Sequence, residues 1–160
     1  MEGEACPIPT NAGGRERDAI GRMLAARTIA VVGLSDDPER TSNHVGGYLQ
    51  GAGYRIIPIN PNCQTALGEK CFGSLTELKE RPDVVLVFRR SEYTPEIAEQ
   101  AVAVKAKGLW LQVGISNREA RHIAENSGLD YIEDRCMMVE HMRRKKSEFR
   151  IQNSEEGNRP

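Results

Sequence analysis

A polar loop near the start of the chain carries the side chains best suited to hold a phosphate. The stretch from Thr28 to Ser42 reads TIAVVGLSDDPERTS. Its apolar run leads to Gly33, and then to two serine hydroxyls and a guanidinium, on Ser35, Ser42 and Arg40. A strand, a glycine turn and a helix in this order present backbone N–H groups at a helix start, where an anion is stabilised. The sequence therefore predicts that this loop binds a phosphate-bearing small molecule.

A second group of cations follows another apolar run. Arg89 and Arg90 come directly after DVVLVF, residues 83–88. Serine hydroxyls can donate to phosphate oxygens, and a guanidinium can make a two-pronged charged contact. The alternative is that Ser42 only caps a helix and that Arg40 is only a solvated charge. The extra arginines at a second strand end favour the phosphate interpretation.

The motifs of two common phosphate ligands are missing. A dinucleotide fingerprint needs G-x-G-x-x-G and an acidic residue after the second strand. Here the loop reads GLSDDP, and the second strand ends in Asn60 and Pro61. The Walker pattern G-x-x-x-x-G-K-[ST] is also absent. Both NAD and ATP are therefore disfavoured.

Alternating apolar runs and helical patterns predict the elements that position these side chains. A helix is expected over 15–27, and Ser42 or Asn43 should cap the next one. Four further helices are expected. One follows a cap at Ser74, one starts at Pro95, one follows a cap at Ser116, and the last covers 137–146. Strands are expected over 28–33, 54–60, 83–88, 108–113 and 129–132. The strand with Pro58 should pair imperfectly at that residue or lie near an edge. This order predicts an α/β fold: a Rossmann-like, doubly wound, mainly parallel five-stranded sheet with helices on both faces.

The bulk properties favour one ordinary globular domain in a reducing compartment. The chain has 160 residues, 39% of them hydrophobic, and a net charge of -1, which argues against a nucleic-acid partner. No apolar run reaches the ~20 residues of a membrane span, and no secretory signal is recognisable. The four widely spaced cysteines predict no metal site and a cytoplasmic location. We expect a flexible leader over 1–14, the domain over 15–146, and a disordered polar tail over 147–160.

Several motifs in order carry a resemblance to a known family. The segments are GLS from Gly33, PERTS from Pro38, GY from Gly53, and PINP from Pro58. They resemble the CoA-binding domain family, whose Rossmann-like fold is shared with the N-terminal domain of the succinyl-CoA synthetase α subunit. The later segments VFR (87–89), LWLQVG (109–114) and DRCMMVEH (134–141) look like those of small stand-alone members. The resemblance covers about residues 18–144.

The resemblance implies a cofactor and a set of contacts. The loop with Gly33 and Leu34 would hold the CoA pyrophosphate, with Ser35, Arg40 and Ser42 as contacts. The adenosine and 3′-phosphate region would be lined by Asn60, Pro61, Phe88 and Arg89. Gln112 would lie along the pantetheine path, and the resulting CoA-binding domain would be residues 15–146.

We therefore expect a protein that binds coenzyme A or an acyl-CoA without catalysis of its own. None of the three histidines lies in a segment that matches the synthetase's catalytic phosphohistidine. An enzyme or partner-dependent subunit acting on a CoA thioester is one alternative, and an NAD(P)-binding oxidoreductase-type domain is another. Cys136 is expected to be a buried residue, although its thiol could also exchange with that of CoA. A homodimer and an unknown partner subunit both stay open.

Overall fold

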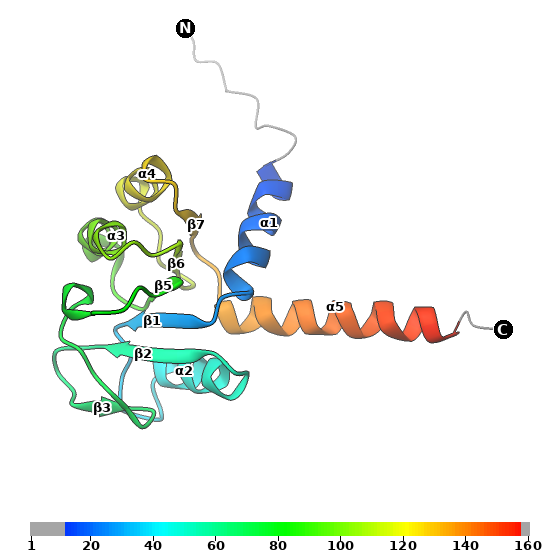
Figure 1. Ribbon diagram of the computed structural model, residues 1–160, viewed down its shortest axis with the longest axis horizontal. Helices are drawn as coiled ribbons and strands as arrows, with labels where there is room; N and C mark the ends of the chain where they lie inside the picture. The colour runs from blue at the N-terminus through cyan, green and yellow to red at the C-terminus, as the bar shows by residue number, and fades with distance from the viewer. Residues whose placement is uncertain (1–11, 158–160) are drawn as a thin grey trace, which may run out of the picture.

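A five-stranded parallel sheet forms the centre of the protein (Figure 1). The computed structural model describes residues 12–157. The strands lie in the order β2-β1-β5-β6-β7, and every neighbouring pair is parallel. The predicted fold class is therefore confirmed. The strands are β1 (Thr28–Val32), β2 (Arg55–Ile59), β5 (Val84–Val87), β6 (Gly108–Leu111) and β7 (Asp130–Ile132).

The strands are apolar because both faces of the sheet are covered. All four residues of β5 and of β6 are buried, as are the last four of β1. The register pairs Val32 with both Ile59 and Val87, so β1, β2 and β5 end side by side. β2 lies at the edge of the sheet, which confirms the prediction made from Pro58.

Helices cover the two faces and define two cores. One face carries α1 (Ala12–Leu24), α2 (Thr41–Gly51) and α5 (Met137–Gly157), and the other carries α3 (Thr94–Ala103) and α4 (Arg118–Asn126). The Trp110 side chain is fully buried in the first core, and its indole Nε1 donates to the Arg135 carbonyl at 2.8 Å. This tryptophan therefore packs the core and links β6 to the segment before α5.

The connection between β2 and β5 contains more structure than the sequence predicts. Residues 62–74 hold a short antiparallel hairpin of β3 (Thr65–Ala66) and β4 (Glu69–Lys70). Phe72 then pairs with Ile59 on the open edge of β2. The helix expected over 75–80 is only a 3-10 turn, η1 (Leu75–Glu77), whose predicted cap Ser74 does accept from the Thr76 amide. A second 3-10 turn, η2 (Ser91–Tyr93), follows β5.

The ends of several helices differ from the sequence-based expectations. The segment 147–157, expected as a disordered tail, continues α5 and projects away from the sheet (Figure 1). No proline or glycine interrupts it before Gly157, and Arg144 pairs with Glu148 one turn later at 3.7 Å. α1 occupies 12–24 instead of 15–27, and α4 is capped by Asn117 instead of Ser116. The rest of the expected leader and tail, 1–11 and 158–160, lies outside the described residues.

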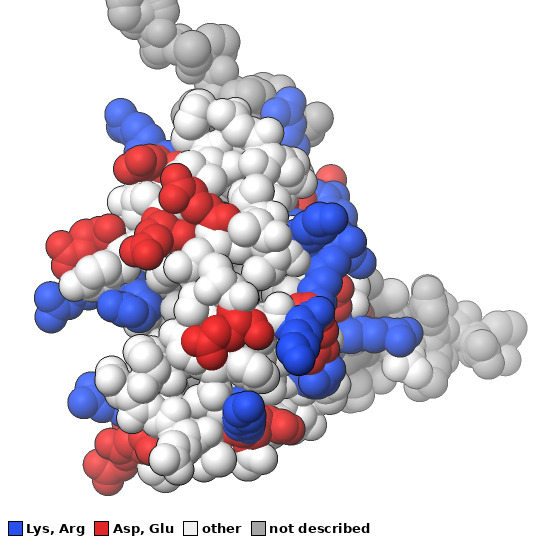
Figure 2. Space-filling view, turned by 60° about the vertical axis from the view of Figure 1, so that its left-hand side comes forward, with Lys and Arg blue, Asp and Glu red and all other residues white. Residues whose placement is uncertain are grey.

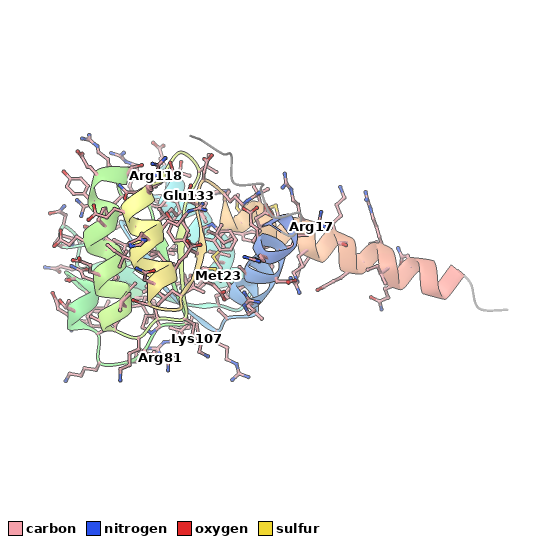
Figure 3. The ribbon with its side chains drawn as sticks, turned by 90° about the horizontal axis from the view of Figure 1, so that it is seen from above. Arg17, Met23, Arg81, Lys107, Arg118 and Glu133 are labelled. Atoms are coloured by element: carbon pink, nitrogen blue, oxygen red, sulfur yellow. The ribbon has the colours of Figure 1, made fainter. Side chains whose placement is uncertain are left out.

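The two ends of the sheet can be told apart by the residues that lie at each of them. Figure 3 shows Arg118 and Glu133 at one end, and Arg81 and Lys107 at the opposite end. Arg118 starts α4, and Glu133 follows β7, so that end holds the carboxyl ends of the strands. The predicted site residues follow β1, β2, β5 and β6, and belong to the same end.

Asp83 fastens the opposite end of the sheet. One carboxylate oxygen accepts from the amides of Arg27 and Thr28, at 2.9 and 3.1 Å. The Lys107 ammonium lies 3.6 Å from the other oxygen. Burial raises the pKa of Asp83, but the two backbone N–H groups and Lys107 outweigh burial and lower it below its ordinary value.

Replacing Asp83 with alanine should make unfolding depend on pH differently from the native chain. The pKa of Asp83 is lower in the folded protein than in the unfolded chain, where it is about 3.9. The stabilisation that its carboxylate gives the folded state is therefore complete above the unfolded pKa, and it is lost as the pH falls through the folded pKa. Asp83→Ala should therefore lower the free energy of unfolding by about 1–3 kcal/mol near pH 7 and by much less near pH 3, as measured by urea unfolding. Glu99→Ala, which removes an exposed α3 carboxylate, is the control. An equal penalty at both pH values would contradict this explanation.

Candidate functional site

The strand order reverses between β1 and β5, which creates a crevice at the carboxyl ends of the strands. β1 leads to α2 on one face of the sheet, and β5 leads to α3 on the other. Ligands of open parallel sheets bind at such a reversal, because the two connecting loops diverge there. Gly33 directly follows β1, and Phe88 directly follows β5. The phosphate loop predicted from the sequence therefore lies at the point where a ligand is expected.

Gly33 allows the two strand ends to approach each other. Its φ is +88°, and a Cβ placed there would lie 3.3 Å from both the carbonyl carbon and the oxygen of Phe88. The Gly33 amide also donates to the Ile59 carbonyl at 2.9 Å. A side chain would be strained by the positive φ and crowded by a neighbouring backbone that cannot rotate away. This position therefore needs glycine for both reasons.

Hydrogen bonds fold the loop back onto the first turn of α2. The Ser35 amide donates to the Ser42 hydroxyl at 3.0 Å, and the Asn43 side-chain amide donates to the Ser35 carbonyl at 2.8 Å. The Ser35 hydroxyl accepts from the Asp37 amide at 3.0 Å. Ser42 is buried, whereas Ser35 is half-buried. Both serines thus set the shape of the loop while their own hydroxyl hydrogens stay available for donation.

The start of α2 lacks the cap predicted for it. We expected Ser42 or Asn43 to cap the helix, but α2 begins at Thr41, and its N-cap Arg40 makes no side-chain capping bond. The prediction is wrong because both side chains bond to Ser35 instead. Within the described residues, α2 also has no acidic side chain in its first turn. Its amide groups and its positive dipole end are therefore left for solvent or an anion.

The charges around the loop have both signs. Arg40 is exposed at the helix start, but Asp36, Asp37 and Glu39 are exposed in the same loop. The face shown in Figure 2 carries both acidic and basic side chains, with several of the basic ones toward its right-hand side. An anion at this loop would therefore be held by directed contacts from N–H groups and Arg40, more than by a broad positive field.

A cavity of about 690 Å³ opens beside Gly33 at the carboxyl ends of β1, β2 and β5. It brings together five of the ten predicted site residues, namely Gly33, Asn60, Pro61, Phe88 and Arg89. Arg89 is exposed, and its guanidinium lies over the Tyr93 ring, 4.5 Å from the ring centroid. The stacked guanidinium keeps its edge free to contact an anion.

Asn60 uses its side chain to join the ends of β1 and β2. Its amide Nδ2 donates to the Leu34 carbonyl at 3.0 Å, and its Oδ1 accepts from the Asn62 amide at 2.8 Å. This position corresponds to the acidic residue of a dinucleotide site. Here it shapes the wall of the cavity and offers no carboxylate to a ribose.

Two predicted site residues point into the interior. The Leu34 side chain is fully buried, so only its backbone can face the loop. The Gln112 side chain is buried, and its Oε1 accepts from the Met137 amide at 3.1 Å at the start of α5. Gln112 therefore supports a helix terminus, and its role along a pantetheine path stays a prediction.

Sequence reasoning missed the cavity residues that come from η2, α3 and the cap of η1. They are Ser74, Tyr93, Glu96, Ile97 and Gln100. Their positions depend on how the segment after β5 turns back over the sheet edge, which no short motif encodes. One signal was available in the sequence, because Tyr93 follows Arg89 at a spacing of four residues. In the structure the Tyr93 side chain is 42% exposed. An exposed aromatic ring beside a cation suits the flat face of a base.

Other kinds of site find less support in the part of the chain that the structure describes. In residues 12–157, no group of three or more His, Cys, Asp or Glu side chains is placed to hold a metal ion. Cys136 is half-buried and packs against the first core. None of the described helices combines the length and apolar character needed to cross a membrane.

The comparison with protein families gives a match over most of the chain. The sequence profile of the CoA binding domain matches residues 27–142, from the start of β1 into α5. The chain belongs to the CoA binding domain family. The match includes the loop after β1, the cavity and the two strand ends that meet at Gly33. Membership in this family therefore agrees with the resemblance found in the sequence.

Small proteins related to this chain match it over most of their own length. The uncharacterized protein YneT of Bacillus subtilis strain 168 is 46% identical over 119 residues, which is 74% of this chain and 88% of YneT. The structure of a hypothetical protein from Pyrococcus horikoshii OT3 has a TM-score of 0.77 and 38% identity, covering 89% of this chain and 98% of that one.

A large enzyme also contains a related region. The ADP-forming acetate–CoA ligase I of Archaeoglobus fulgidus is 21% identical over 126 residues, which is 72% of this chain. The aligned region is only 18% of the ligase. This chain therefore corresponds to one part of that enzyme.

Gly33→Ala should be more damaging than the same change at a glycine with open space. Gly53 also has a positive φ, +105°, but nothing lies within 4 Å of a Cβ placed there. Gly53→Ala should cost about 1–2 kcal/mol for the backbone conformation alone. Gly33→Ala should cost about 1 kcal/mol more, because the Phe88 backbone must also move. Thermal and urea unfolding measure both, and equal penalties would show that the close approach to Phe88 is unimportant.

Proposed function

We propose that this protein binds coenzyme A or an acyl-CoA at the crevice between β1 and β5. The pyrophosphate lies against the start of α2, where Ser35 and Ser42 donate their hydroxyl hydrogens and Arg40 supplies a charged contact. Family membership supports the class of ligand. The observation that carries the assignment is the uncapped α2 terminus, which follows a loop whose first residue, Gly33, lines the cavity at the strand reversal.

The cavity suits the nucleotide half of such a ligand. Phe88 and Pro61 offer apolar surface to the adenine, and Arg89 lies within reach of a 3′-phosphate at the same rim. The Tyr93 ring beneath the guanidinium restricts its movement, which lowers the entropy lost on binding. Gly33 lets the ligand approach the backbone of the loop closely.

An NAD(P)-binding role is less well supported. A ribose diol is normally bound by a carboxylate at the end of the second strand. Asn60 occupies that position, and both ends of its amide already bond to the protein backbone. The CoA assignment does not require that carboxylate.

We propose binding without catalysis by this chain alone. The described residues that line the cavity include the carboxylate of Glu96 but no histidine, cysteine or lysine. His141 bonds through Nδ1 to the Tyr48 hydroxyl at 2.9 Å, where α5 packs against α2. The relation to an ADP-forming acetate–CoA ligase favours a second candidate, a subunit that presents CoA to the active site of a partner. For either role, the cytoplasm is the compartment that we propose.

Calorimetric titration should show binding of CoA and acetyl-CoA, and none of NAD or NADP. Arg40→Ala should weaken CoA binding roughly tenfold or more, which corresponds to about 1.4 kcal/mol for a lost charged hydrogen bond. Arg81→Ala removes the same charge at the opposite end of the sheet, and is the matched control (Figure 3). The melting temperature of each apo variant shows whether folding is preserved.

Two results would contradict the assignment. Binding of NAD without binding of either CoA species would reject the ligand class. CoA binding that Arg81→Ala weakens as much as Arg40→Ala would reject the loop as the site, because it would reflect only the overall charge.

A further inference from the structure

Two thiols meet beside the phosphate loop and have no part in the proposed binding. Cys63 precedes the β3–β4 hairpin and Cys71 follows it, and their sulfur atoms lie 2.9 Å apart. Both residues are free cysteines and are half-buried. The Cys71 amide donates to the Gln64 carbonyl at 2.9 Å, which extends the antiparallel pairing of the hairpin to its ends.

The geometry allows the two sulfurs to bond. A disulfide joins sulfur atoms at about 2.05 Å, so these two must approach by about 0.9 Å. The backbone bond from Cys71 to Gln64 already holds the two strands together next to the pair. Closing the bond therefore requires a small side-chain movement and no rearrangement of the hairpin.

The hairpin links the thiols to the candidate site. The Cys63 sulfur lies 3.9 Å from the Leu34 carbonyl, which also accepts from Asn60. Leu67 at the hairpin turn packs against Gly46 of α2, and its carbonyl accepts from the Gln50 side chain at 3.0 Å. A covalent bond between the thiols would therefore form within contact distance of the loop after β1.

The Cys71 thiol ionises less readily than an ordinary cysteine. Burial, together with the hydrogen bond and the charge of Cys63, raises the pKa of Cys71 well above its ordinary value, and the Asp36 carboxylate adds to the effect. The thiolate is the nucleophile in disulfide exchange, so Cys71 reacts poorly while Cys63 is reduced. Once Cys63 is bound in a mixed disulfide, its charge and hydrogen bond no longer raise the pKa of Cys71. Cys63 is then the attacking thiol and Cys71 the resolving one.

We propose that Cys63 and Cys71 form a reversible dithiol–disulfide pair that is oxidised by low-molecular-weight disulfides. The Cys63 thiolate attacks one sulfur of R–S–S–R, which forms Cys63–S–S–R and releases one R–S⁻. The Cys71 thiolate then attacks the Cys63 sulfur, which forms the protein disulfide and releases the second R–S⁻. The two thiol protons pass through water to the leaving thiolates, so two electrons move from the protein to R–S–S–R, giving two R–SH.

Oxidised glutathione tests this proposal in a full-length chain that carries Cys6→Ser and Cys136→Ser. We expect intact mass spectrometry to show the loss of two hydrogens, denatured thiol titration to fall from two groups to none, and dithiothreitol to restore both. Cys71→Ser in this background should stop at one glutathionyl adduct on Cys63. Cys63→Ser should slow modification roughly tenfold or more, because burial still raises the pKa of the Cys71 thiol that remains.

Three results would overturn the proposal. They are retention of both thiols after prolonged exposure to oxidised glutathione, a stable adduct on each cysteine without an internal bond, and a disulfide between two chains. Far-UV circular dichroism and the melting temperature of the reduced variants show whether the serine substitutions preserve folding. The reaction is run without CoA, so its failure would be distinct from a failure of CoA binding.

Discussion

The close approach of Gly33 to the backbone of Phe88 is the constraint on which the site depends. It brings the ends of two neighbouring strands within contact distance, while the chains that follow them leave on opposite faces of the sheet. The loop after β1 then has to turn toward α2, and the segment after β5 has to turn toward η2 and α3. The cavity lies where these two segments diverge. A larger side chain at residue 33 would open this junction and displace both walls.

A second constraint leaves the first turn of α2 without a side-chain cap, so that its amides can bind an anion. A serine or asparagine at a helix N-cap commonly accepts a hydrogen bond from an amide of the first turn. In α2 the nearby Ser42 and Asn43 bond to Ser35 instead, so the loop is fixed and the helix start is uncapped. The same side chains thus account both for a rigid loop and for amide groups that can meet an anion. Because acidic residues lie in the same loop, this directed geometry matters more than net charge.

The sequence allowed the fold to be predicted because its signals are local. Apolar runs such as the one from Ile29 to Val32 mark buried parallel strands, and Pro58 marks an edge strand. Individual side-chain contacts decided the features that the sequence did not predict. Gln112 looked like a rim residue, but its amide meets the start of α5, and the caps expected at residues 42 and 116 were displaced by alternative bonds. Tyr93 lines the cavity beside Arg89, and the spacing of these two residues in the sequence does not by itself show that their side chains stack.

The central claim is that CoA lies across the loop after β1 and the segment after β5. The most direct measurement is a two-dimensional amide NMR spectrum of the labelled protein, recorded while CoA is added. We expect the largest shifts at residues 33–43, with further shifts at 60–62 and 88–93, and little change in the turns at 26–27 and 105–107 at the opposite end of the sheet. Shifts concentrated at that opposite end, or none at saturating CoA, would contradict the account.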